Sequence, residues 1–335
     1  MPQISVILPV CNGVKFLSRA VDSLLAQTCR DWELLIINEY GSDDGSAELA
    51  AQYARRDGRI RVLQNRQRLG LAESLNLGFR AAAGDFLARM DADDISYPER
   101  FEKQLAFLRA HPEVGICGGW QRHVRGKRCW VHRPPSDPAR LAASLLFTCE
   151  LCHSTVMLRR ETVERFHLYY DPRFQAEDYE LWTRAISVTK LVNLPEILGD
   201  YHVGDTITLR KMGALEKEHG EICAAALERN LGLTVSRGGT ALLNAWRNIF
   251  RHEQNRKRRE QMLSEYRYLL QRVYSANCTT GFLPEQALLD VLRRRWLWAK
   301  WDIRNEKATA ASIEGVFRPM PLAQCRWIVQ KLQKC

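Results

Sequence analysis

Three carboxylates lie within four residues at Asp91, Asp93 and Asp94, directly after the apolar segment that runs from residue 85 to residue 90. Carboxylate oxygens suit Mg²⁺ or Mn²⁺, and Mg²⁺ is commonly held by one or two carboxylates together with phosphate oxygens and water. The cluster therefore predicts a divalent cation, Mn²⁺ or Mg²⁺, that is bound together with a diphosphate. The alternative is a solvated turn that caps a helix, since acidic residues are common at turns.

A second acidic pair, Glu177 and Asp178, precedes Leu181 and Trp182 in a segment of helical spacing. Acidic side chains stabilise the N-terminus of a helix, so helix capping alone explains their position. A positioned carboxylate can also act as a general base. Capping and catalysis are compatible, and both interpretations remain open for this pair.

The elements that position these residues follow from the hydrophobic pattern. Short apolar runs alternate with segments of helical spacing over about the first 200 residues, which predicts an α/β fold. Strands are expected at residues 4–10, 32–37, 60–63 and 85–90. Open α/β sheets bind ligands beyond the carboxyl ends of their strands, so Asn12, Glu39 and Asp91 should converge on one cleft.

Two local signals predict the helices on either side of the acidic cluster. The first helix is expected over residues 70–83, with Gly84 ending it in a left-handed conformation. The second is expected to begin at Ser96-Tyr97-Pro98-Glu99, with Ser96 as the N-cap and Glu99 three residues later.

Length and composition limit the class of protein. The 335 residues, 46% hydrophobic and 26% charged, are typical of a globular protein with one large or two ordinary domains. We find no apolar run that approaches the roughly 18 residues of a membrane-spanning helix and no secretion signal, so a cytoplasmic location is expected. The ten cysteines are scattered, which favours reduced thiols over a disulfide framework.

The net charge of +10 is concentrated in the C-terminal part. Residues 205–335 hold 23 Lys and Arg against 13 Asp and Glu, and their spacing predicts helices. The arginine runs favour a solvated helix face, with nucleic-acid binding as an alternative of another class. Trp296, Trp298 and Trp301, beside Arg293 to Arg295 and Lys300, also suit a surface that rests on an anionic membrane.

Four blocks of this sequence, in matching order and spacing, resemble glycosyltransferase family 2. They are Ile4 to Gly13, Leu69 to Gly78, Ala88 to Asp94, and Glu177 to Trp182. The resemblance implies an inverting, non-processive enzyme of bacterial type that moves a sugar from a nucleotide-diphosphate sugar, preferably UDP-linked, to an acceptor hydroxyl. It further implies cell-surface polysaccharide or glycan synthesis, a glycan or lipid-linked acceptor, and no nucleic-acid partner.

The same resemblance implies the architecture. Residues 1–205 would form a catalytic domain of the GT-A fold, a Rossmann-like mixed sheet flanked by helices. Its nucleotide-binding half would span about residues 1–95 and its acceptor half about residues 96–205. Residues 206–335 would form a basic helical C-terminal region, peripheral on the inner face of the membrane.

The resemblance also implies roles for single residues. Asp93 would be the principal metal ligand, Asp91 would contact the ribose or the metal, and His202 would be a further ligand. Asp178 would take the proton of the acceptor hydroxyl, with Glu177 as the alternative base. The implied nucleotide-binding residues are Pro9, Val10, Asn12, Glu39, Gly70 and Asp91.

The sequence departs from the family pattern in the nucleotide-binding half. Cys11 replaces a common aromatic residue, and Glu39-Tyr40 stands where two aspartates are common. A Glu39 carboxylate can still accept a hydrogen bond from a nucleobase N–H, so uridine remains preferred, and a non-catalytic nucleotide-sugar binder is the alternative. His153 resembles a further family block and either lines the acceptor side or packs as a hydrogen-bonded core residue.

Overall fold

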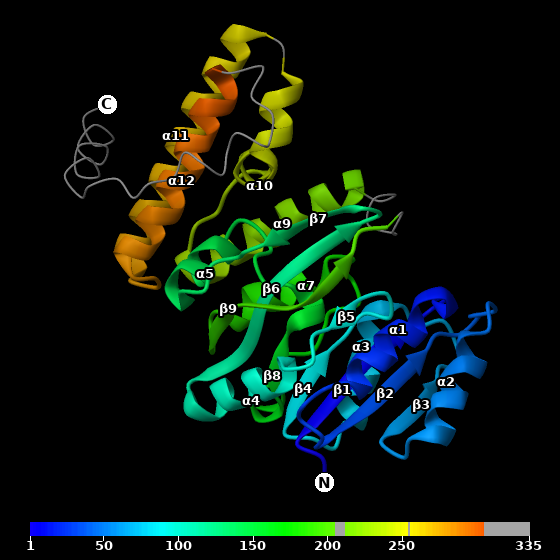
Figure 1. The fold of residues 1–335 in the computed structure, drawn as a ribbon. Helices are drawn as coiled ribbons and strands as arrows, with labels where there is room; N and C mark the ends of the chain where they lie inside the picture. Colours follow the sequence, from blue (N-terminus) through cyan, green and yellow to red (C-terminus); the bar gives the residue numbers. More distant parts are fainter. Residues whose placement is uncertain (205–211, 254, 305–335) are drawn as a thin grey trace. The chain divides into compact units, whose positions relative to one another are not determined.

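The computed structural model describes residues 1–204, 212–253 and 255–304 (Figure 1). The chain divides into two compact units, an N-terminal unit from Met1 to Ala226 and a C-terminal unit that begins at Leu227. This division lies within helix α9 (Met212–Leu231). The domain boundary expected after residue 205 stays a prediction.

Four parallel strands form the first part of the sheet in the N-terminal unit, in the order β3-β2-β1-β4 (Figure 1). Their bounds are β1 (Ile4–Val10), β2 (Trp32–Asn38), β3 (Ile60–Gln64) and β4 (Phe86–Arg89). Every residue of β2 and β4 is buried, as expected for a parallel sheet that helices cover on both faces. The four strands predicted from the apolar runs are thus confirmed.

The sheet continues from β4 with mixed strand directions, in the order β8-β6-β9-β5. Strand β8 is antiparallel to β4 and to β6, β9 is parallel to β6, and β5 is antiparallel to β9. Strand β7 pairs with the second half of β6 as a hairpin. The bounds are β5 (Ile95–Ser96), β6 (Val114–Arg125), β7 (Arg128–His132), β8 (Met157–Arg159) and β9 (Lys190–His202).

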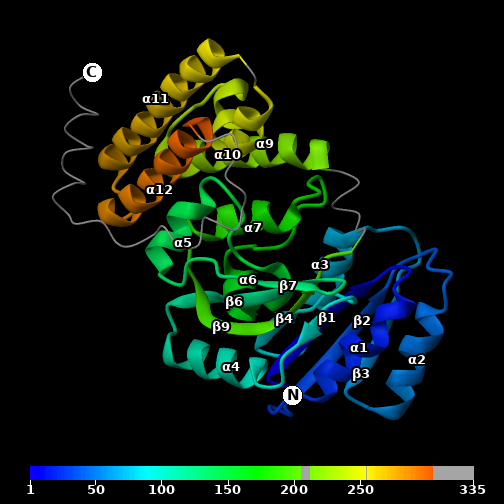
Figure 2. The same ribbon diagram turned by 45° about the horizontal axis from the view of Figure 1, so that its top comes forward.

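Two hydrophobic clusters fill the spaces between the sheet and the helices on its two faces (Figure 2). One cluster packs α1 (Val14–Leu25), α2 (Ser46–Arg56) and α4 (Arg100–Ala110). The other packs α3 (Leu71–Ala81), α5 (Pro138–Leu145), α6 (Arg160–Arg165) and α7 (Glu177–Ala185). The predicted mixed sheet flanked by helices is confirmed.

Two glycines show how closely the chain approaches β1. A Cβ atom on Gly78 of α3 would lie 2.5 Å from Cγ2 of Ile7, so this helix requires a glycine where it packs on the sheet. Gly84 was expected to be left-handed, and that expectation is wrong, because it is not among the residues with positive φ. A Cβ on Gly84 would lie 2.7 Å from the backbone nitrogen of Ser5, which explains the glycine by close approach instead.

The helix start predicted at Ser96 is also wrong. Ser96 belongs to β5 and pairs with Gly199, and α4 begins at Arg100 without a side-chain cap from its own N-cap residue. Gln27 takes over the capping role. Its Oε1 accepts a hydrogen bond from the backbone N–H of Phe101 at 3.1 Å, and its Nε2 donates to Ser96 Oγ at 3.1 Å.

The described residues of the C-terminal unit are helical, as predicted. They include α10 (Arg237–His252), α11 (Arg256–Thr280) and α12 (Glu285–Arg304). Helix α11 ends at Gly281, which has a left-handed φ of 63°. The side-chain amide of Asn277 donates a hydrogen bond to the carbonyl of Leu283 and accepts one from its backbone N–H. Across the described helices, none combines the length and apolar character needed to cross a bilayer.

The basic and aromatic side chains of α12 are partly buried within this unit. Arg294 is exposed, whereas Trp296 and Trp298 are half-buried and Arg295 donates a hydrogen bond to the carbonyl of Leu243. The side chains of Lys300 and Trp301 lie outside the described residues. The surface expected to rest on an anionic membrane therefore stays a prediction.

Candidate functional site

The loop after β1 is held by the loop after β2, which brings two strand ends together. Asn12 has a left-handed φ of 52°, and its Oδ1 accepts a hydrogen bond from the backbone N–H of Asp43 at 3.0 Å. Three successive backbone amides then donate to side chains of the second loop: Asn12 to Ser42, Gly13 to Ser46, and Val14 to Asp44. Asn12 is therefore fixed in position beyond the end of β1.

Glu39 joins the ends of β1 and β2 to the loop before α3. Its backbone N–H donates to the carbonyl of Val10 at 2.9 Å. Its Oε2 accepts from the Gly70 amide at 2.6 Å, and its Oε1 accepts from the Leu69 amide and from Asn65 Nδ2. Burial by itself would raise the pKa of Glu39, but these bonds lower it overall. Glu39 is thus an ionised carboxylate that already holds the chain around Gly70.

The acidic loop follows β4 directly, so its three carboxylates lie just beyond the C-terminal end of that strand. Asp91 forms an ion pair with Arg89, whose side chain is buried. Asp94 is buried, accepts a hydrogen bond from Ser154 Oγ and accepts another from the His202 amide at 2.8 Å. These contacts tie the loop after β4 to the short turn His153–Thr155 before β8 and to β9.

Asp93 differs from the other two carboxylates of the loop. Burial and the charge of Asp91 raise the pKa of Asp93. No group of three or more His, Cys, Asp or Glu within the described ranges is arranged to hold a metal ion. A cation that brings phosphate oxygens as its other ligands needs only one or two carboxylates. The oxygen ligands of Asp91 and Asp93 fit such an ion, which would also compensate the charge that burial penalises at Asp93.

Two buried arginines support this loop from within the core. Arg100 donates from Nη2 to the carbonyl of Arg89 at 2.8 Å and to that of Val156 at 3.1 Å, and from Nε to Gln104 at 3.0 Å. Burial and the nearby Arg89 lower the pKa of Arg100 to about 9. The charge of Arg89 also acts on Glu177 and Asp178, whose pKa values it lowers. The charge of the buried Arg89 therefore acts both on the acidic loop and on the start of α7.

The carboxylates of Glu177 and Asp178 lie at the first turn of α7 among neutral groups. Burial and the charge of Asp178 raise the pKa of Glu177 to about 8, and burial also raises that of Asp178. Asp178 Oδ1 accepts from the Tyr179 amide at 2.7 Å, and its Oδ2 lies 3.7 Å from the thiol of Cys149. This pair retains a proton at neutral pH, which is the state from which acid–base chemistry is possible.

His153 lies next to Glu177 and resolves one of the alternatives left open by the sequence. Its Nδ1 is 3.8 Å from Glu177 Oε1, and its Nε2 is 2.8 Å from the hydroxyl of Tyr170. Burial and the charge of Arg89 hold the pKa of His153 well below its usual range, so the imidazole is neutral. His153 is a packed, hydrogen-bonded residue that lies between Glu177 of the acidic pair and Tyr170.

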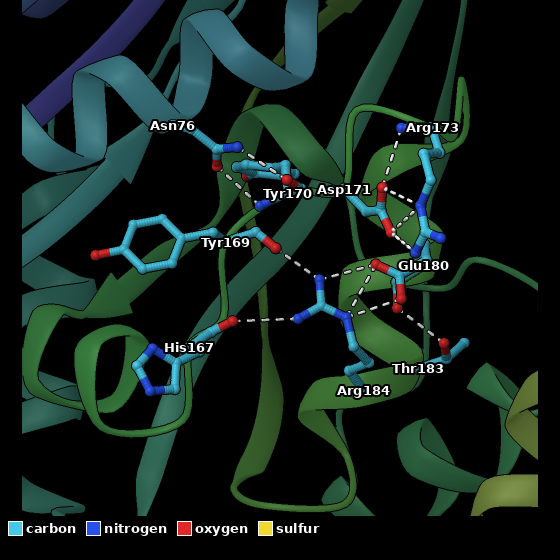
Figure 3. A network of polar contacts seen from close by, with 9 residues as sticks. All are labelled: Asn76, His167, Tyr169, Tyr170, Asp171, Arg173, Glu180, Thr183 and Arg184. Atoms are coloured by element: carbon cyan, nitrogen blue, oxygen red, sulfur yellow. Dashed lines mark hydrogen bonds and ion pairs between the residues drawn. The ribbon is translucent and has the colours of Figure 1, made fainter.

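The segment before α7 is held between two helices (Figure 3). Asn76 of α3 bonds both backbone polar groups of Tyr170, at 2.8 and 2.9 Å. Arg184 of α7 donates to the carbonyl of Tyr169 at 2.6 Å and is paired with Glu180. These contacts place the Tyr170 side chain against His153 and thus connect α3, which follows the Glu39 and Gly70 contacts, with the start of α7.

His202 is placed near the acidic loop, mainly through its backbone. Its amide holds Asp94, and its ring lies 4.8 Å from the ring of Phe16, measured between centroids. Its charge contributes to lowering the pKa of Asp93, where burial and Asp91 have the larger, opposite effect. The assignment of His202 as a metal ligand stays a prediction.

Several residues that shape the site were not singled out from the sequence. Arg89 and Asn76 belong to the family-like blocks, but no local pattern distinguishes a buried support from a residue that contacts substrate. Tyr170 and Ser154 lie outside those blocks, and only the folded chain brings them to the acidic residues.

Comparison with known proteins identifies the family. Residues 5–166 match Glycosyl transferase family 2. An uncharacterised glycosyltransferase of Haemophilus influenzae is 30% identical over 210 residues, which cover 62% of this chain and 77% of that protein. This chain belongs to glycosyl transferase family 2. The family resemblance carried by the four sequence blocks is therefore confirmed.

Other members and a solved structure extend this comparison. The putative glycosyltransferase EpsE of Bacillus subtilis is 35% identical to this chain over 191 residues, which cover 55% of this chain and 66% of EpsE. The match thus spans slightly less than two thirds of EpsE. The structure of S. aureus TarS residues 1–349 with UDP-GlcNAc has a TM-score of 0.61 at 16% identity, covering 91% of this chain and 89% of that one. The likeness to TarS confirms the expected GT-A fold.

Proposed function

We propose that this family 2 member transfers a sugar from a nucleotide-diphosphate sugar to an acceptor hydroxyl, with inversion at the anomeric carbon. The observation that carries the proposal is the buried Arg89, whose charge acts on two acidic groups. One is the loop of Asp91 and Asp93 at the end of β4, and the other is the pair Glu177 and Asp178 at the start of α7. Sugar transfer requires both groups, since one handles a diphosphate and the other a proton.

The donor side is proposed to bind UDP. The rigid loop at Asn12, the strand end at Pro9 and Val10, and the Glu39 contact to Gly70 line up at the carboxyl ends of β1 and β2. Ligands of open α/β sheets bind at such ends. TarS, which shares the fold, was solved with UDP-GlcNAc, and this supports a uridine nucleotide as the first candidate.

The leaving group requires charge stabilisation. As the bond between the anomeric carbon and the diphosphate oxygen breaks, the nucleoside diphosphate leaves with the electron pair. A divalent ion held by Asp93 and Asp91 would supply Lewis-acid stabilisation of that charge. Arg89 orients Asp91 through their ion pair.

The acceptor hydroxyl must lose its proton as its oxygen attacks the opposite face of the anomeric carbon. Asp178 is proposed as the base, because Glu177, with a pKa raised to about 8, retains its own proton at neutral pH. His153 and Cys149 contribute neutral contacts around this pair rather than charge. The acceptor is proposed to belong to a glycan, as in the polysaccharide synthesis that the family resemblance implies.

Calorimetric titration tests the proposal directly. UDP is titrated into the native chain and into Asp93→Asn, with and without Mn²⁺, and sugar transfer or hydrolysis is measured with a panel of nucleotide sugars. The native chain should bind UDP more tightly with Mn²⁺, and Asp93→Asn should lose most of that gain. Asp85→Asn, at the other end of the same strand and exposed, is the matched control.

Two outcomes contradict the proposal. Equal UDP and Mn²⁺ affinities in the native chain and in Asp93→Asn would exclude Asp93 as a metal ligand. Tight binding of a nucleotide sugar without transfer or hydrolysis under any condition would favour the non-catalytic binder.

A further inference from the structure

A row of aromatic side chains crosses three strands of the N-terminal unit. His123 of β6 is paired with Trp130 of β7 on one side and with Tyr201 of β9 on the other. Ring centroids are 5.4 Å apart for His123 and Trp130 and 5.0 Å apart for His123 and Tyr201. His132, two residues after Trp130, lies 5.4 Å from His123 in the same cluster.

The two faces of the sheet differ sharply at this point. Residues that are directly opposite on neighbouring strands share a face, so Trp130, His123 and Tyr201 line the same side. The preceding residues point to the other side, where Arg122 is paired with Asp200 at 2.6 Å and the Tyr97 hydroxyl donates to Asp200. One face is therefore closed by an ion pair, whereas the other presents rings.

The rings themselves carry no charge at neutral pH, and the nearest charges on this face are Arg125 and Arg128, which are opposite each other two residues away along β6 and β7. Burial and the nearby His132 lower the pKa of His123 to about 4, and burial lowers that of His132 as well. Neutral rings of this kind suit the C–H face of a sugar ring better than a phosphate or carboxylate. The polar atoms of the histidines and of Tyr201 remain available to hydroxyl groups.

The row is continuous with the acidic loop. Tyr201 precedes His202, whose amide holds Asp94, and all three carboxylates of the loop act on the Tyr201 hydroxyl. At the other end Trp130 is 46% exposed, which is unusual for the largest side chain. Because neighbouring strands are about 4.8 Å apart, three strands provide a platform about 10 Å long that runs away from the donor side.

We propose that Trp130, His123 and Tyr201 form the acceptor subsite, which binds a neutral pyranose ring of a glycan by stacking and hydroxyl contacts. The inference rests on the proposed function, because it takes the acidic loop as the donor end. It adds the position and the chemistry of the acceptor: an uncharged sugar that lies along the β7-β6-β9 face. Trp130 is the specificity-determining residue, because it is the exposed end of the row.

Saturation-transfer NMR tests the subsite with defined probes. The full chain, with UDP and Mn²⁺, is mixed with methyl glycopyranosides of glucose, galactose, mannose and N-acetylglucosamine. At least one probe should receive saturation on its ring C–H protons. In Trp130→Ala this probe should bind roughly tenfold more weakly, whereas Trp130→Phe should retain most of the binding because a ring is kept. Tyr268→Ala, another exposed aromatic, is the matched control and should bind the probe like the native chain.

A UDP titration of each variant separates the two proposals. UDP affinity should be the same in the native chain, Trp130→Ala and Trp130→Phe, and transfer to an accepted probe should show a raised acceptor KM with an unchanged donor KM. Absence of saturation for every probe, or equal saturation in Trp130→Ala and the native chain, would overturn the acceptor subsite. Loss of UDP binding by the native chain would instead contradict the proposed function. Should Trp130→Ala fail to fold, Tyr201→Phe decides: it should weaken the probe and leave UDP affinity unchanged, and either unchanged probe binding or equal weakening of UDP and probe would overturn the subsite.

Discussion

The acidic loop after β4 and the acidic pair at the start of α7 each place adjacent carboxylates in a largely buried setting. In the loop, Asp91 is paired with Arg89, and Asp94 accepts hydrogen bonds from Ser154 and from the His202 amide. At α7, Glu177 lies 3.8 Å from a neutral His153. Asp91 and Asp94 are therefore held by direct contacts, whereas Glu177 has a neutral imidazole beside it; burial raises the pKa of Asp93 and Asp94 as well as that of the α7 pair.

This difference matches the two kinds of chemistry that sugar transfer needs. A phosphate-binding group must be held in a fixed position, which direct contacts provide, and a divalent ion would offset the burial that raises the pKa of Asp93. A group that exchanges a proton needs a pKa near the working pH, and burial among neutral side chains raises it into that range. The single buried cation that both regions share, Arg89, limits how far either set of pKa values can rise.

The largest effect is expected for Arg89→Met, which removes that shared cation. The part-buried Asp91 would lose its partner, and breaking a fully buried ion pair costs about 3–5 kcal/mol, so a loss at the lower end of that range is expected. Urea unfolding should show this loss. Arg80→Met breaks an exposed pair with Glu73 and should cost at most about 1 kcal/mol. Equal unfolding midpoints for the two variants would show that Arg89 does not compensate the acidic residues.

Asp178→Asn is expected to have the next largest effect, this time on catalysis. The variant should bind UDP like the native chain but transfer sugar roughly 10²-fold more slowly or worse, the usual scale for a positioned base. Single-turnover rates with saturating donor measure the difference. A greater loss in Glu177→Gln than in Asp178→Asn would exchange the two roles, and a loss confined to donor affinity would assign Asp178 to binding.

Ser154→Ala tests whether the loop is held by its contacts. Asp94 would keep the His202 amide but lose the hydroxyl, and a buried acceptor that loses a partner costs about 1–3 kcal/mol. The unfolding free energy should fall by that amount while the transfer rate with saturating donor changes little. Ser264→Ala on α11, whose hydroxyl bonds only a helix carbonyl at 3.1 Å, should leave the unfolding free energy unchanged. A transfer rate that falls more than stability would give Ser154 a direct part in the reaction.

The sequence predicted the four parallel strands and both acidic groups, because apolar runs and carboxylates at strand and helix ends are local patterns. The contacts between those groups could not be read in the same way. Ser154 reaches Asp94 across 60 residues, and Asn76 reaches Tyr170 across 94. The start of α4 was misplaced for a related reason: its cap, Gln27, comes from α1's far end rather than from the adjacent Ser96. Local signals thus predict which residues carry chemistry, and long-range contacts decide how they are held.

A separate effect is expected in the pH dependence of stability, and it concerns Glu177 rather than the loop. A carboxyl with a raised pKa keeps its proton in the folded chain over a pH range where the unfolded chain has lost it. Glu177 should therefore make the native chain less stable as pH rises from 4.5, its ordinary pKa, to about 8. Glu177→Gln is neutral at every pH and lacks this penalty. The melting temperature of Glu177→Gln minus that of the native chain should thus increase from pH 5 to pH 8, by about 2–4 °C for each kcal/mol removed.

The control is Glu164→Gln. Glu164 is an exposed residue of α6, so this variant should show a constant difference in melting temperature over the same pH range. If Glu177→Gln also shows a constant difference, Glu177 is ionised in the folded chain. The contrast between a loop held by direct contacts and an α7 pair that retains a proton would then no longer hold.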